Sequence, residues 1–204
     1  MILQRSINCD FNNIGFHNGR YMYKKTFLNT NLNGNIKKEV ENILSAYWLD
    51  TTPIDINKII EKMKITITID TLIPMDVMID INNRKKPVII LKLEKSNNLS
   101  RFLLAHALGH YVLCHGKFFE DNLNDVFNED MLVENYLDIN KEKESSLFAS
   151  NILMPDKSIK YFIYKNNMPL KTLANYFNVP ILLAENRVKA FLSENKQYNS
   201  YFDV

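Results

Sequence analysis

The chain has 204 residues, of which 46% are hydrophobic and 24% charged, with 25 basic and 23 acidic side chains. This length predicts one domain with at most a small appendage, and the apolar fraction is ample for a core. The balanced charge removes the electrostatic argument for nucleic acid or an anionic membrane as an obligatory partner, although a local patch stays open. With no long apolar run, no signal-peptide pattern, and two cysteines (Cys9 and Cys114) outside any metal or redox spacing, we expect a cytoplasmic protein with free thiols and no membrane partner.

The first third of the chain changes from an irregular pattern to a helical one. Residues 1–35 show no sustained period and predict an irregular arm or a short strand pair, of unknown role. Apolar residues at helical spacing predict a helix over 36–49, which Pro53 and the two threonines before it follow. A second apolar stripe predicts another helix, for which Asp55 or Asn57 provides the N-cap.

The pattern then alternates with a period of two. Residues 65–69, 77–81 and the VIILKL run after Pro87 predict three short strands, with Asn82 and Asn83 as turn residues between the last two. These strands predict a small antiparallel or mixed sheet.

The segment SNNLSRFLLAHALGHYVLCHG predicts a helix that is capped by Asn98 or Ser100 and closed by Gly116. Because it is apolar nearly all round, it is expected to be buried. His115 falls at its end, where we expect a half-exposed side chain, the alternative being a group that supports a metal ligand.

The last third combines an acidic stretch with a basic tail. Residues 119–140 hold seven acidic and no basic side chains, which predicts a solvated loop or surface helix, or else an acidic rim that serves function. KEKESSLFASNILMP predicts a further helix. Residues 157–196 hold seven basic and two acidic side chains, and their apolar pattern predicts two short helices joined by a tight turn.

Two histidines carry the chemical signal of this sequence. On a helix, residues four apart lie on one face, so His106 and His110 present both imidazoles to one point, as a metal ion requires. A catalytic zinc also needs a third protein ligand, for which Glu144 on the following helix is the best candidate. The alternatives are that the histidines are hydrogen-bonded core residues, and that Glu144, like its neighbour Glu142, lies at the surface.

RFLLAHALGHYVLCHG followed by EKESSLFASNILMP resembles the ImmA/IrrE family of metallopeptidases, in which HExxH precedes a motif like ExExxxFAxxLLMP. The resemblance extends over about residues 36–192. It implies an α+β, zincin-like fold of helices around a small sheet, with a metallopeptidase domain at 36–160 and a helix-turn-helix-like tail at 161–204 packed on it. It also implies that His106, His110 and Glu144 bind a divalent metal, preferably Zn²⁺.

The sequence departs from the family pattern at one position, since Ala107 stands where HExxH has its glutamate. That glutamate takes a proton from the metal-bound water, and its loss costs on the order of 10²–10⁴ in rate. We therefore expect an inactive form that keeps its metal ligands. A deliberate Glu→Ala change and a natural pseudoenzyme both explain this, and the intact ligand positions favour the first.

The resemblance further implies that the substrate is a helix-turn-helix repressor, cut to release genes of a mobile element, prophage or stress response. The acidic stretch would then steer a basic substrate. Asn186, Arg187 and Lys189 are candidates for DNA contact, but the small positive charge of the tail favours packing instead. The alternatives are a non-catalytic metal-binding regulator that captures a repressor or DNA, and a toxin-antitoxin-associated member of the family.

Overall fold

The computed structural model confirms the α+β class and describes residues 15–17, 20–22, 32–47, 52–73, 76–80, 87–92, 96–113, 115, 118–121, 136–165 and 170–201. The described helices are α1 (Leu32–Tyr47), α2 (Ile56–Lys62), α3 (Asn97–Val112), α5 (Tyr136–Leu153), α6 (Asp156–Lys165), α7 (Leu170–Phe177), α8 (Ile181–Glu194) and the 3-10 helix η2 (Lys196–Tyr201). The strands are β1 (Gly15–His17), β2 (Arg20–Met22), β3 (Thr66–Ile69), β4 (Val77–Asp80), β5 (Val88–Leu91) and β6 (Phe118–Asp121). None of the described helices combines the length and the apolar character that a membrane crossing requires.

The main sheet is mixed, as the sequence predicts, with the strand order β3-β5-β4-β6. β3 runs parallel to β5, whereas β4 is antiparallel to both β5 and β6. The three expected strands are confirmed, but the interpretation of the whole 119–140 stretch as loop or surface helix is wrong at its start, where β6 pairs with β4. Its four residues, FFED, are too few to show an alternating pattern. The expected turn at Asn82 and Asn83 lies outside the described residues.

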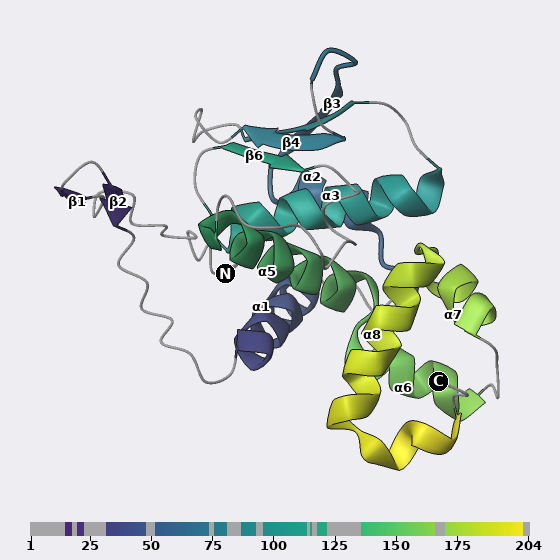
Figure 1. Cartoon of the computed structure of the whole chain (residues 1–204). Coiled ribbons are helices and arrows are strands. Elements are labelled where there is room, and N and C mark those ends of the chain that lie inside the picture. The colour runs from purple at the N-terminus through teal and green to yellow at the C-terminus, as the bar shows by residue number, and fades with distance from the viewer. Residues whose placement is uncertain are drawn as a thin grey trace.

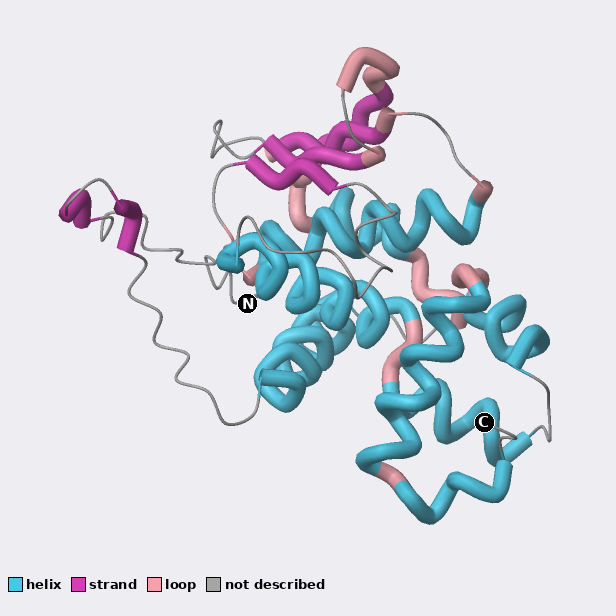
Figure 2. Tube along the Cα trace, viewed as in Figure 1, coloured by secondary structure: helices cyan, strands magenta, loops and turns pink. Residues whose placement is uncertain are grey.

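α3, α5 and α1 form layers on one side of the sheet, and α6, α7 and α8 gather in a group beside these layers (Figures 1 and 2). α3 contacts β4 and β5 on one side and α5 on the other, and α1 packs on α5. Because α3 is covered from both sides, every residue from Arg101 to His110 is buried, which confirms the prediction made from its all-round apolar character. Large side chains from α3 and α5, among them Phe102 and Phe148, fill this core.

Several predicted helix boundaries shift in the structure. The N-cap of α2 is confirmed as Asp55, whose carboxylate accepts a 3.0 Å hydrogen bond from the Lys58 backbone N–H. The expected N-cap of α3, Asn98 or Ser100, is wrong, because α3 begins at Asn97, with Ser96 as the preceding residue. α5 begins at Tyr136, inside the acidic stretch. The closing role expected for Gly116, like the two cysteines, lies outside the described residues.

The first 35 residues are described in part, and the strand pair is confirmed there as the antiparallel β1–β2 pair. α1 begins at Leu32, before the expected start at Ile36. The division into an arm, a peptidase domain and a tail stays a prediction.

The carboxyl-terminal part contains the two predicted helices, α7 and α8, and also α6, which the sequence pattern missed. Asn178, with a φ of +51°, lies in the turn between α7 and α8. Its carbonyl accepts a 3.1 Å hydrogen bond from Nε of Arg101, a mostly buried side chain of α3. This contact fixes the helix pair against the core, while the helix-turn-helix-like character of the tail stays a prediction.

Charged side chains tie α8 to α1 and α6. Arg187 of α8 is only 2% exposed, donates to the Met154 carbonyl at 3.1 Å and pairs with Asp156. Lys37 of α1 pairs with Asp156 at 2.9 Å and with Glu194. Burial raises the pKa of Asp156, but the charge of Arg187 and hydrogen bonds from Lys37 and Arg187 outweigh it, so that this pKa is lowered.

We expect the Asp156→Asn variant to lose about 2 kcal/mol of unfolding free energy at neutral pH, because buried Arg187 loses a charged hydrogen-bond acceptor. Since the folded-state pKa is lowered, the stabilisation is complete above the unfolded value of about 3.9 and disappears as the pH falls through the folded value. Urea unfolding at a series of pH values checks this. A gap between wild type and variant that stays constant down the series would contradict it. Glu185→Gln, which removes only the exposed pair with Lys189, is the control and should cost less than about 0.5 kcal/mol.

Candidate metal centre

Two imidazoles from α3 face each other in the core. His106 and His110 are 0% and 1% exposed, and their Nε2 atoms lie 3.1 Å apart. They lie on the same face of α3 because they are one helical turn apart. The structure thus brings together the two histidines that the sequence singled out.

A carboxylate from α5 completes a group of three donors. Oε2 of Glu142 lies 3.1 Å from Nε2 of His106, and Oε1 lies 3.4 Å from Nε2 of His110. These donors are among the described groups that could hold a metal ion. Two ligand atoms of a tetrahedral zinc, each about 2.0–2.1 Å from the ion, lie about 3.3–3.4 Å apart. The 3.1 Å between the two Nε2 atoms and the 3.1 Å between Nε2 of His106 and Oε2 of Glu142 are close to this value, and one ligand atom from each of the three residues lies within 4.8 Å of the others.

Glu144 has a different partner. Its Oε2 lies 3.0 Å from Nε2 of His115, and the structure does not bring it into the three-donor group, where Glu142 lies instead. His115 is 6% exposed, so the expectation of a half-exposed side chain is wrong. The sequence analysis chose Glu144 from its position in the motif, but which of the two glutamates faces the histidines depends on how α5 is rotated about its axis.

A glycine lets α3 and α5 approach closely. A Cβ added to Gly109 would lie 3.1 Å from both the Cα and the carbonyl oxygen of Ser145, and 3.1 Å from Cδ1 of Phe148. Two of these three atoms belong to the α5 backbone, which cannot rotate away as a side chain can. Gly109, inside the HALGH motif, is therefore the point at which the helix carrying the histidines meets the helix carrying Glu142.

Ala107, next to His106, is 1% exposed and belongs to the hydrophobic core. A methyl group cannot accept a proton. The three-donor group thus lies directly beside a position that lacks the base of HExxH.

The other candidate residues lie elsewhere. Of the three proposed for DNA contact, Arg187 is buried and engaged with Met154 and Asp156, and Lys189 pairs with Glu185 at 2.7 Å. The third, Asn186, is exposed. Of the seven acidic residues in 119–140, the structure describes only the backbone of Glu120, Asp121 and Asp138.

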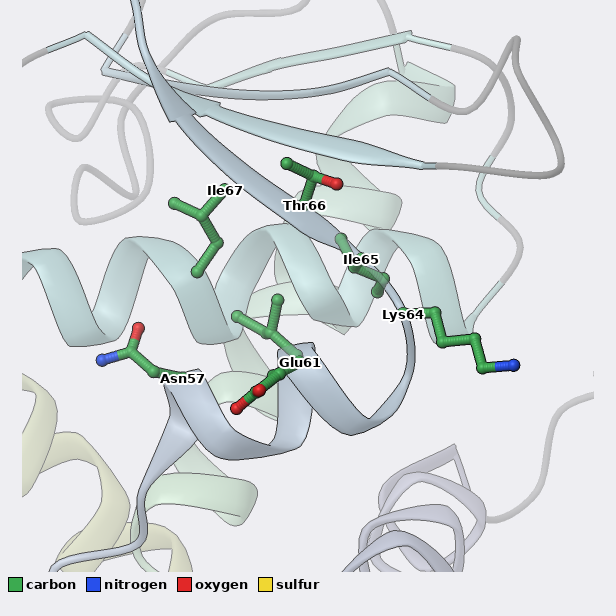
Figure 3. Close-up of a pocket in the computed structure, with 7 residues that line it drawn as sticks. Asn57, Glu61, Lys64, Ile65, Thr66 and Ile67 are labelled. Atoms are coloured by element: carbon green, nitrogen blue, oxygen red, sulfur yellow. The ribbon is translucent and has the colours of Figure 1, made fainter.

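A shallow, open pocket between α2 and β3 contains none of the metal-site residues (Figure 3). Its lining is Asn57, Ile60, Glu61, Lys64, Ile65, Thr66 and Ile67. This lining mixes apolar and charged side chains and contains no group of metal-binding donors. Among the described residues, such a group lies at the two histidines and Glu142.

Comparison with protein families agrees with this geometry. The Peptidase M78 family model, described as the IrrE N-terminal-like domain, matches residues 60–189, which is more than half of the chain. The chain belongs to this family, as the paired motifs predict, and is thereby related to metallopeptidases. The match includes both histidines and both glutamates. No curated protein matches the chain significantly.

The close contact between Gly109 and α5 determines how a substitution at this position changes the unfolding free energy. Gly→Ala within a helix ordinarily stabilises by about 0.5–1 kcal/mol. We expect Gly109→Ala instead to lower the unfolding free energy by about 1–3 kcal/mol, because the α5 backbone must move. Urea unfolding measures this, with Gly34→Ala in the first turn of α1 as the matched control that should not destabilise. A Gly109→Ala protein with a raised unfolding free energy would contradict this prediction, because it would show that α5 moves away from α3 without loss of stability.

Proposed function

We propose that the chain is a zinc-binding member of the metallopeptidase family in which His106, His110 and Glu142 hold the ion. The group of three donor residues between α3 and α5 is the observation that supports this proposal. The chemistry of the donors also supports it, since two imidazoles and one carboxylate are a common catalytic zinc set. A bound zinc would polarise a peptide carbonyl and lower the pKa of a water molecule.

We further propose that the protein, as this sequence stands, does not hydrolyse peptides efficiently. Proton transfer from water to the leaving amine needs a base close to the metal, and Ala107 offers none. Glu142 cannot substitute while its oxygens bind the ion. The expected loss is on the order of 10²–10⁴ in rate relative to a chain with glutamate at position 107.

The proposed partner is a helix-turn-helix repressor, bound at the metal site as a substrate that the base-less chain retains. The family resemblance supports this, and the seven acidic residues of 119–140 would attract a basic protein. A natural non-catalytic regulator is the second candidate function. It is favoured by the burial of Ala107 in the core beside an otherwise complete donor group.

Metal analysis tests the ligand set. We expect the purified full chain to bind one zinc ion, and Glu142→Gln to lose most of this binding because an amide is a much poorer zinc ligand than a carboxylate. Glu61→Gln, which changes an exposed glutamate of α2 in the same way, is the control. Zinc content by mass spectrometry after dialysis checks this. Full occupancy in Glu142→Gln would rule out Glu142 as a ligand.

Restoring the base tests the proposed chemistry. We expect Ala107→Glu to cleave the repressor encoded beside the protein at a rate on the order of 10²–10⁴ above the parent. Ala107→Gln supplies similar bulk without a base and should stay at the parent rate. Cleavage is followed by electrophoresis and mass spectrometry of the fragments. A zinc-loaded Ala107→Glu protein that binds the repressor and leaves it intact would favour the non-catalytic regulator.

A further inference from the structure

The metal-site histidines begin a longer chain of polar contacts that continues through buried His115 to partly buried Glu144. Nδ1 of His110 lies 3.1 Å from Nδ1 of His115, and Nε2 of His115 lies 3.0 Å from Oε2 of Glu144. The His115 ring meets the His110 ring edge to face, with centroids 5.1 Å apart. The contact with His115 is thus made by Nδ1 of His110, the ring nitrogen that does not belong to the three-donor group.

The proton positions along this chain follow from the chemistry of neutral imidazole, which has one N–H and one lone pair. If Nε2 of His110 gives its lone pair to a metal ion, the N–H must lie on Nδ1 and donate to Nδ1 of His115. The remaining N–H of His115 then lies on Nε2 and donates to the Glu144 carboxylate. Each contact of the chain thus has one donor and one acceptor.

The second ligand ring is supported in a similar way. Nδ1 of His106 lies 3.2 Å from Oγ of Ser146, which can accept its N–H when Nε2 binds the metal. Ser145 Oγ also lies 3.1 Å from Nδ1 of His115, where it competes with the His110 N–H for the single lone pair of that nitrogen. α5 therefore supplies both the carboxylate in front of the histidines and polar groups behind them.

We infer that His115 and Glu144 are positioning residues for the metal centre, which fix the tautomer and the ring orientation of His110. This inference rests on the proposed zinc site. It gives the second glutamate of the EKESS motif a separate role from the first: Glu142 binds the ion, and Glu144 terminates the hydrogen-bond chain behind it. Ligand histidines generally donate their other N–H to such a partner, which raises their basicity.

The test compares zinc affinities of the full chain by competition with a chromophoric chelator. We expect His115→Gln and Glu144→Gln each to weaken zinc binding on the order of 10- to 100-fold, and Glu142→Gln to weaken it further. Because both positioning residues act through one chain of hydrogen bonds, the double variant should lose little more zinc affinity than the single variant with the larger loss. Glu61→Gln is the control, and thermal unfolding without zinc identifies a variant that does not fold.

A spectroscopic readout separates positioning from general packing. With ¹⁵N-labelled histidine, the zinc-loaded protein should show His110 bound through Nε2 and protonated at Nδ1, with that proton exchanging faster with water in His115→Gln. Unchanged affinity and exchange in both variants would overturn the inference while leaving the zinc site intact. A Glu144→Gln loss as complete as that of Glu142→Gln would overturn it by making Glu144 a ligand. A wild-type chain that binds no zinc would overturn both the inference and the proposed function.

Discussion

The close approach of α3 and α5 at Gly109 is the constraint on which the site depends. Side chains of ordinary size hold packed helices about 8–10 Å apart. Here the missing Cβ of Gly109 allows the backbone of Ser145 to come within van der Waals contact of α3. Since the histidines flank this point on α3 and Glu142 lies one turn before it on α5, the distances among the three donors are set by the same contact.

This contact also explains how the core tolerates polar groups. Burying unpaired imidazoles in an apolar core costs free energy, so each ring needs a partner on both nitrogens. Apart from Arg101 and its histidines, the buried residues of α3 are apolar. α5 supplies the partners of the histidines: Glu142 and Ser146 for His106, and the Glu144 carboxylate for His115. α5 is therefore polar toward α3 at its middle and apolar toward its end, where Phe148 and Ile152 join the core.

The sequence predicts much of this architecture because its patterns are local. The period-two runs around Ile67, Ile79 and Ile89 define three strands, and the apolar stripes define α1, α2, α7 and α8. Two features are not local. β6 forms by pairing with β4, and its four residues alone do not predict that pairing. α6 follows α5 after only a short break around Pro155, so the sequence pattern does not separate it as a helix of its own.

The site shows the same division. The spacing of His106 and His110 on one helix predicts their meeting, because helix geometry alone decides it. The third donor depends on the rotation of α5 against α3, which is set by Gly109 and by the burial of Phe148. The position in the motif favours Glu144. Glu142 and Glu144 lie on different sides of α5, however, and the contacts place Glu142 beside the histidines.

We propose that α3 and α5 together form a nitrogen- and oxygen-donor zinc site. X-ray absorption of the zinc-loaded full chain measures this most directly. We predict two imidazoles and oxygen ligands at about 2.0–2.2 Å, with one imidazole lost in His106→Ala. A sulfur ligand at about 2.3 Å, or an unchanged spectrum in His106→Ala, would contradict it.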